Sequence, residues 1–216
     1  MVPAFVYPTA RATAAAALVM LALPGSAYIY QGEELGLPEH TTLPDEARQD
    51  PSFFRTGGAE RGRDGCRVPL PWVASAPGFG FGPYPDASGD DGGTAGSGGA
   101  VSSGRPWLPQ PASFARYAAD RQVGVPGSTY ELYRDLLALR SEHALGRGGL
   151  EWAAPHDPEA GILAFRNGPV LVVANMGAAP VKMPQGWRPA VSSRDDAVAD
   201  GALEPDACVW MLAERD

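Results

Sequence analysis

Apolar residues recur along the chain with different periods, and each period predicts a different kind of element. Residues 13–23 are almost all apolar and stop at a Pro-Gly pair, which predicts a helix over this segment. Residues 128–140 repeat their apolar positions every three or four residues, as an amphipathic helix does. After Leu150 the period falls to two, which is typical of strands that bury one face.

The second helix has recognisable ends. Ser128 and Glu131 have the spacing of a capping box, in which the two side chains satisfy backbone N–H groups at a helix start. Arg140 and His143 place basic groups in the last turn, and Gly146 follows them, as is common after a helix C-terminus. The apolar stripe, which we expect to face the core, consists of Leu132, Tyr133, Leu136, Leu137 and Leu139.

Six short strands are expected beyond this helix, and together they predict a small antiparallel β domain. They are Leu150–Ala153, Ile162–Asn167, Val170–Asn175, Val181–Met183, Trp187–Val191 and Val209–Ala213. Asn167-Gly168 between the second and third of these is a strong hairpin signal. We expect Trp152, Trp187 and Trp210 to be core or interface residues, with a surface platform for sugars as the alternative.

A further apolar run, Ala27–Gln31, is predicted to be a strand that ends at a polar point. Two carboxylates, Glu33 and Glu34, follow it at once. Because adjacent residues of an extended chain face opposite sides, only one of the two can point beyond the strand end, and the spacing favours Glu34.

A cationic segment follows later in the chain. Arg61, Arg63 and Arg67 surround Asp64 ahead of a Pro-framed aromatic residue, Trp72. Guanidinium groups beside an aromatic ring suit the binding of a sugar or a carboxylate. The alternative is an Arg/Asp ion-pair cluster that only holds the loop in place.

Residues 74–104 have a different composition, dominated by Gly, Ser, Asp and Pro. Such a segment has no apolar period, and we expect a flexible insertion with little order. Asp86, Asp90 and Asp91 lie within it, but they lack the spacing and the closing glutamate of a calcium loop. A solvated insertion is therefore expected here, without a metal.

Composition narrows the class of ligand. The net charge of −8 argues against a nucleic-acid partner and fits a protein that handles neutral ligands. The two cysteines are too few for a disulfide framework, so reduced thiols and a cytoplasmic location are expected. The three histidines lack metal-ligand spacing, and we expect no metal, no cofactor and no membrane partner.

Four blocks of sequence, in this order along the chain, carry a resemblance to a known family. They are GSAYIYQGEELGLP from Gly25, ERGRDGCRVPLPW from Glu60, PWLPQP from Pro106 and STYELYRDLLALR from Ser128. Together they resemble the C-terminal portion of an α-glucosidase, similar to oligo-1,6-glucosidases, in glycoside hydrolase family 13 of the α-amylase superfamily.

The resemblance implies an α/β fragment, made of the last helix–strand–helix units of a (β/α)8 barrel, followed by a small all-β antiparallel C-terminal domain. Residues 11–145 would form the barrel part, including the insertion at 74–104, and residues 146–216 the β domain. Residues 1–10 match nothing in the family. A complete barrel takes about 250 residues, more than the 216 of this chain.

The resemblance also implies retaining hydrolysis of terminal α-linked glucose from oligosaccharides, as part of carbohydrate metabolism. In this family the nucleophile aspartate, the acid/base glutamate and a second aspartate follow barrel strands four, five and seven, outside this chain. We therefore expect no catalytic residue here and no activity from the chain alone. Arg63, Asp64 and Arg67 would contact substrate, and Gln31 and Glu34 would support the site.

Two other functions remain open. The first is a secreted, non-catalytic carbohydrate-binding or interaction module, because residues 1–27 imitate a secretory signal peptide. The second is a fragment of a related sucrose isomerase or trehalose synthase. In the barrel reading the apolar residues of the first helix, such as Leu18 and Leu21, would lack a surface to pack on, which predicts an upstream barrel fragment or self-association.

Overall fold

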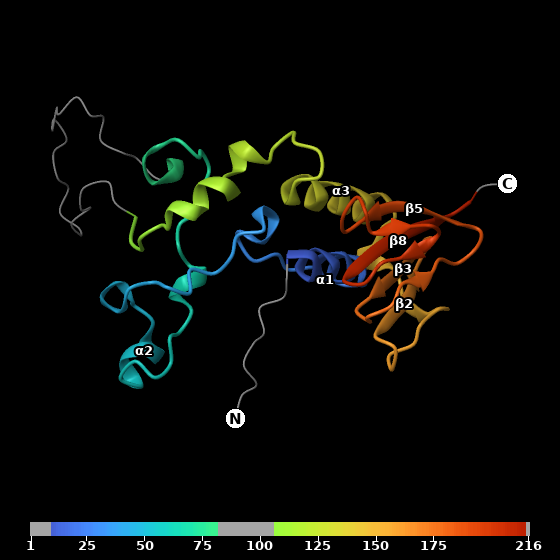
Figure 1. Ribbon diagram of the computed structural model, residues 1–216, viewed down its shortest axis with the longest axis horizontal. Coiled ribbons are helices and arrows are strands. Elements are labelled where there is room, and N and C mark those ends of the chain that lie inside the picture. Colours follow the sequence, from blue (N-terminus) through green and yellow to red (C-terminus); the bar gives the residue numbers. More distant parts are fainter. Residues whose placement is uncertain (1–9, 82–105, 215–216) are drawn as a thin grey trace. The chain divides into compact units, whose positions relative to one another are not determined.

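The computed structural model describes residues 10–81 and 106–214 (Figure 1). The chain divides into two compact units. The first, here called the helix–sheet unit, comprises the chain up to Tyr30 and again from Gly124 onward. The second, here called the loop unit, is Gln31–Val123.

The helix–sheet unit contains a five-stranded sheet in which every neighbouring pair is antiparallel. Its order is β1 (Glu151–Trp152), β2 (Ile162–Asn167), β3 (Val170–Asn175), β8 (Ala207–Ala213) and β5 (Trp187–Ser192). A three-stranded sheet joins β4 (Val181–Lys182), β7 (Ala202–Leu203) and β6 (Val198–Ala199). The predicted antiparallel β domain is confirmed. Two strands were not predicted, β6 and β7, because two residues are too few to show an alternation.

The hairpin between β2 and β3 forms, and both strands have the predicted bounds. Asn167 pairs with Val170, so the two turn residues are Gly168 and Pro169. Gly168 has a φ of 56°, a region that glycine enters without steric cost. Asn167 is therefore the last residue of β2 and not part of the turn, and its side chain is fully buried.

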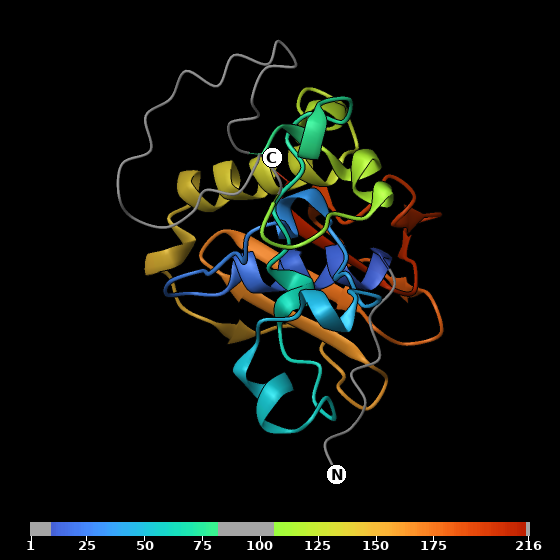
Figure 2. The ribbon, with the colours of Figure 1, turned by 90° about the vertical axis from the view of Figure 1, so that its left-hand side faces the viewer.

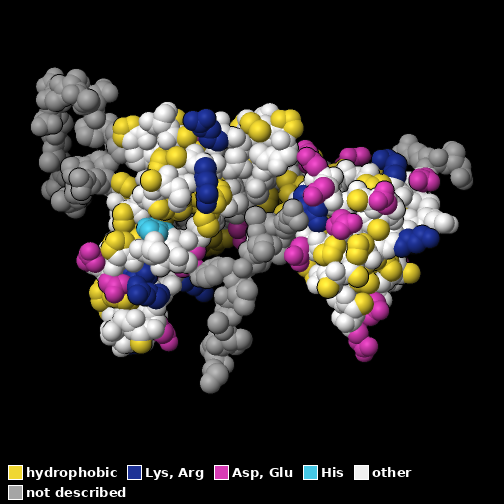
Figure 3. All heavy atoms as spheres, viewed as in Figure 1, with side chains coloured by type: hydrophobic (Ala, Val, Ile, Leu, Met, Phe, Trp, Pro, Cys, Tyr) yellow, Lys and Arg dark blue, Asp and Glu magenta, His cyan; other side chains and the backbone are white. Residues whose placement is uncertain are grey.

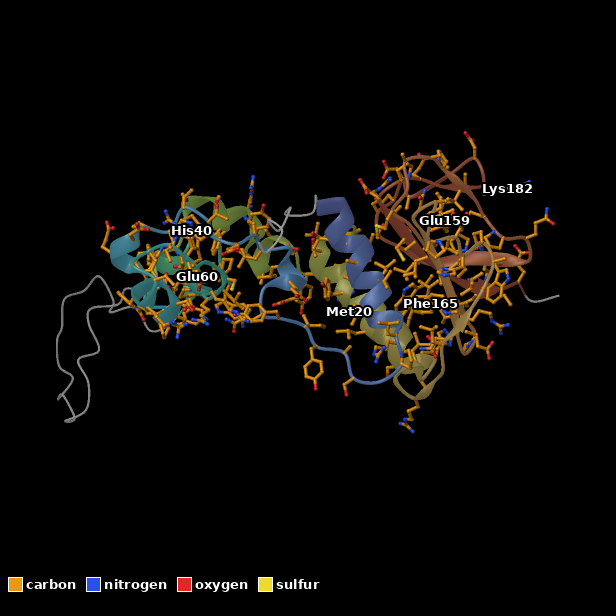
Figure 4. The ribbon with its side chains drawn as sticks, turned by 90° about the horizontal axis from the view of Figure 1, so that it is seen from below. Met20, His40, Glu60, Glu159, Phe165 and Lys182 are labelled. Carbon is orange, nitrogen blue, oxygen red and sulfur yellow. The ribbon has the colours of Figure 1, made fainter. Side chains whose placement is uncertain are left out.

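Both faces of the five-stranded sheet are covered. One face packs against α1 (Ala10–Ala22) and α3 (Thr129–Glu142), where Trp210 and Phe165 meet Leu18 of α1 in one core cluster (Figure 1). Met20 of α1 and Phe165 of β2 are labelled in Figure 4 and belong to this cluster. The other face forms a second cluster, which includes Leu171, Val173, Val209, Met211 and Leu203.

The expectation that α1 has no packing surface within this chain is wrong. Leu18, Leu21 and Ala22 are fully buried in the same cluster as Trp210. Burying each large apolar side chain contributes about 1.5–3 kcal/mol, and here the β sheet and α3 supply the surface. The sequence pattern could not show this, since the partners of α1 lie more than a hundred residues away in the chain.

The segment Ala27–Gln31, predicted to be a strand, does not form one. A strand requires a neighbour to pair with its backbone groups, and no described strand lies beside this segment. Ala27 and Ile29 pack partly against the core of the helix–sheet unit. Tyr28 and Tyr30 are 83% and 46% exposed.

The start of α3 follows the prediction, and Arg140 lies in its last turn with His143 as the C-cap. Ser128 Oγ accepts the Glu131 N–H at 3.2 Å, as the capping pattern predicts. The helix ends at Glu142, and the residue with positive φ after it is Ala144 rather than Gly146. The Gly146 carbonyl instead accepts the Gly25 N–H at 2.9 Å, next to the end of α1.

The loop unit consists of short helical turns around a small core (Figure 2). Its elements are η1 (Glu33–Leu35), η2 (Asp45–Ala47), α2 (Pro51–Arg55), η3 (Asp64–Cys66), η4 (Pro77–Gly80), η5 (Ala112–Tyr117) and η6 (Ala119–Arg121), while η7 (Leu145–Arg147) belongs to the helix–sheet unit. Leu43, Val68, Leu108 and Phe114 are buried together. Most of the predicted insertion, including Asp86, Asp90 and Asp91, lies outside the described residues. None of the described helices is long and apolar enough to span a membrane.

Candidate functional site

Asp64 is the buried centre of the segment that the sequence singles out. Its residue surface is only 2% exposed. Its Oδ2 accepts the backbone N–H groups of Gln49 and Asp50, both at 2.8 Å. Asp64 therefore joins η3 to the start of α2, two segments that are separated in the sequence.

Asp50 completes this junction from the other side. It is the N-cap of α2, where its Oδ1 accepts the Ser52 N–H at 2.9 Å. Its Oδ2 accepts the Arg63 N–H at 2.9 Å and lies 3.3 Å from an Arg67 guanidinium nitrogen. The backbone hydrogen bonds from Arg63 and Ser52 hold the pKa of Asp50 below its ordinary value of 3.8.

The close approach at this junction depends on a glycine. Gly62 has a φ of 67°, and a Cβ added to it would lie 2.4 Å from the carboxyl carbon of Asp50. Neither the conformation nor the space admits a side chain there. The GRDG spacing thus has a packing reason besides any role in binding.

A second cluster of charges lies beside the junction. Arg48 is 5% exposed and donates to the carbonyl oxygens of Leu43 and Arg61, both at 2.9 Å. Asp45 accepts from Arg48 at 3.2 Å and from Arg61 at 2.5 Å. Figure 3 shows basic and acidic side chains side by side on the loop unit.

Sequence reasoning missed Asp50 and Arg48, and a signal was present for the first of them. Asp50-Pro51-Ser52 is an N-cap residue followed by Pro at the first helical position, a recognisable helix start. For Arg48 no local signal exists, because two of its acceptors are backbone carbonyls that only the fold brings together.

The two arginines of the predicted substrate site remain accessible. Arg63 is exposed, and its guanidinium forms no ion pair with any residue in the described part of the chain. The Arg67 side chain is 44% exposed, although it lies 3.3 Å from Asp50 and 3.9 Å from Asp64. The structure thus brings Arg63, Asp64 and Arg67 together around Asp50, with two guanidinium groups able to meet hydroxyl or carboxylate oxygens.

Gln31 and Glu34 are placed in a separate turn of the loop unit. Glu34 Oε2 accepts the Gly32 N–H at 2.8 Å, and Gly32 has a φ of 95°. Gln31 is exposed. Among the described residues neither side chain hydrogen-bonds to the group around Asp50, so their supporting role is a prediction that this structure leaves open.

A cavity of about 710 Å³ lies elsewhere, within the helix–sheet unit. It is bordered by the start of α3 and by residues 191–196, which span the end of β5 and the segment after it, and none of the predicted site residues lines it. Within the described residues, no three His, Cys, Asp or Glu side chains are grouped as a metal site would require.

Comparison with known proteins identifies the family. Residues 6–85 match the family "Alpha amylase, catalytic domain". A probable alpha-glucosidase of Rhizobium meliloti is 35% identical over 162 residues, which cover 74% of this chain and 25% of that protein. This chain corresponds to the C-terminal part of an α-glucosidase-like member of the α-amylase family.

Solved structures share the fold of this chain. The alpha-glucosyl transfer enzyme XgtA covers 97% of the α-glucosidase-like chain at 29% identity, with a TM-score of 0.70, and 37% of XgtA is matched. The trehalulose synthase MutB from Pseudomonas mesoacidophila covers 94% at 24% identity, with a TM-score of 0.68 and 38% of MutB matched. The fold class is therefore a barrel fragment followed by a small all-β domain. The chain spans about a quarter of the length of its curated relatives.

Proposed function

We propose that this chain belongs to an enzyme that hydrolyses terminal α-linked glucose from oligosaccharides with retention of configuration. The proposal rests on the loop around Asp50. There the buried carboxylates of Asp50 and Asp64 accept backbone N–H groups and fix the loop, and Arg63 and Arg67 on this loop stay accessible. Relatives named as alpha-glucosidases and oligo-1,6-glucosidases support the substrate class.

Arg63 and Arg67 are the proposed contacts to sugar hydroxyl groups. Their guanidinium groups are accessible, and neither is buried in an ion pair. Asp64 belongs to the same proposed site but acts through the backbone, since its Oδ2 accepts the N–H groups of Gln49 and Asp50. Its role is to position the loop that presents the arginines.

The chain alone is proposed to be inactive. Retaining glycosidases need two carboxyl groups about 5–5.5 Å apart, and the family resemblance assigns both to earlier barrel strands. Gln31 and Glu34 then support the site in the complete barrel. In this proposal residues 11–145 are the barrel part and residues 146–216 the β domain, and the partner is an upstream barrel segment.

Two measurements test the proposal. The purified chain is assayed on 4-nitrophenyl α-glucoside, where we expect no turnover above the blank. Turnover that disappears in Glu34→Ala would overturn the proposed inactivity. In the second measurement the part of this chain that aligns with the Rhizobium meliloti relative, 74% of its residues, replaces the matching segment of that protein, and the chimera is expected to release glucose from maltose.

Transfer or isomerisation is the second candidate, favoured by the similarity to the alpha-glucosyl transfer enzyme XgtA. Product analysis of the same chimera on sucrose separates the two outcomes. Free glucose and fructose support hydrolysis, whereas trehalulose or isomaltulose would support isomerisation.

Burial of α1 argues against the secreted module. Leu18 and Leu21 belong to the core around Trp210, so removal of residues 1–27 as a signal peptide would take away part of that core. We therefore propose that the segment is retained and that the protein is cytoplasmic. Intact-mass measurement of the mature protein tests this, since loss of residues 1–27 would contradict it.

A further inference from the structure

Trp152 is an exposed indole that no part of the proposed function uses. It lies on β1, which pairs with β2 and forms one edge of the five-stranded sheet. The residue is 60% exposed, although tryptophan carries one of the largest apolar side chains. An indole left open in this way has surface available for a ligand.

Two neighbouring rings hold the indole in one orientation. The His156 ring stacks on it with centroids 4.2 Å apart and an interplanar angle of 17°. Phe165, directly opposite on β2, meets it edge to face at 6.4 Å and 88°. Because the imidazole covers one indole face, the exposed area belongs mainly to the opposite face, which is presented as a flat, preoriented surface.

His156 is itself held in place by a backbone hydrogen bond from β2. The Ala164 N–H donates to His156 Nδ1 at 3.3 Å. In a neutral imidazole the nitrogen that accepts carries no hydrogen, so Nε2 carries it and donates. The uncovered indole face matches a pyranose, which offers an apolar C–H face that can stack on a flat ring.

We propose that Trp152 is a stacking platform for one glucosyl residue of an α-linked oligosaccharide. Glu151, Asp157 and Glu159, near Trp152 in the chain, are exposed and charged. A stable protein interface would need about 800 Å² on each partner with an apolar centre, and charged neighbours disfavour such a centre. The choice of a glucoside rests on the proposed function.

Titration of the full chain with maltose tests the platform, read by calorimetry and by the indole N–H signals in NMR spectra. We expect saturable binding with a Kd on the order of millimolar. Trp152→Ala should weaken it by at least about tenfold, and Trp152→Phe, which keeps a ring, by no more than about threefold. The matched control is Trp107→Ala, because Trp107 is also exposed, at 54%, and lies in the loop unit.

Several results would overturn the platform. They are an unchanged Kd in Trp152→Ala, no saturable binding of maltose, or sorbitol binding as tightly as maltose. A dimer that dissociates in Trp152→Ala would assign the ring to a second copy of the chain instead. Failure of the chimera to hydrolyse maltose while the chain still binds it through Trp152 would overturn the proposed function and leave the platform standing.

Discussion

The indole Nε1 of Trp210, on β8, donates a hydrogen bond of 2.9 Å to the carbonyl oxygen of Leu18, on α1. Both residues are at most 1% exposed. The bond joins the first helix of the chain to its last strand, so these distant segments share one core. The stability of α1 therefore depends on the β domain.

Trp210→Phe removes the indole donor and part of the buried ring. We expect the free energy of unfolding to fall by about 1.5–3 kcal/mol, from the lost hydrogen bond and the space left behind. Urea denaturation followed by far-ultraviolet circular dichroism measures this change. The exposed Trp107 provides the control, since Trp107→Phe should change stability by less than about 0.5 kcal/mol. Equal losses in both variants would contradict the assigned role of Trp210.

Asn167 fixes the end of α1 by a different contact. Its Nδ2 donates to the carbonyl oxygens of Ala22 at 2.7 Å and Leu145 at 3.0 Å, and the residue is fully buried. Asn167→Ala leaves both contacts unmade, and we expect a loss of about 2–4 kcal/mol in the same denaturation measurement. Asn167→Asp keeps the shape but turns the donor into an acceptor, so an Asp variant as stable as the wild type would refute this account.

Asp50 should make stability depend on pH at the acidic end. Its native pKa lies below the ordinary value of 3.8, through the backbone hydrogen bonds from Arg63 and Ser52. The unfolded state therefore takes up the proton first as the pH falls. The stabilisation is present above the unfolded pKa and is lost as the pH drops through the native pKa.

Asp50→Asn should accordingly lower stability at pH 7 and flatten the stability curve below about pH 4. Thermal unfolding monitored across this range measures both effects. The exposed Glu46, in the same unit, serves as control, because Glu46→Gln should keep the wild-type curve. A variant curve parallel to that of the wild type would rule out the assigned titration.

A comparison of variants at Arg63 and Arg61 distinguishes an effect on substrate binding from an effect on stability. In the chimera, Arg63→Ala should lower kcat/KM by about tenfold or more and change the free energy of unfolding by less than about 0.5 kcal/mol. Arg61 is also exposed but pairs with Asp45, so Arg61→Ala should leave kcat/KM unchanged. A similar kcat/KM in the two variants would remove Arg63 from the proposed site.

Local sequence signals determined several elements of this protein. β2 and β3 have the predicted bounds, Ile162–Asn167 and Val170–Asn175, because the alternation of side chains and the glycine turn lie within the segment itself. The Ser128 cap of α3 was likewise predictable, since donor and acceptor are three residues apart. The four sequence blocks also determined the family, which the comparisons confirmed.

Only the tertiary structure decided how these elements are used. It set α1 against β8 through Leu18 and Trp210, left Ala27–Gln31 without a partner strand, and placed Asp50 between Ser52 and Arg63. Each of these outcomes depends on groups that lie far apart in the chain, or on the lack of a neighbour. A hydrogen bond or a buried contact between distant residues leaves no periodic trace in the sequence, because its free energy arises only when the fold brings the partners together.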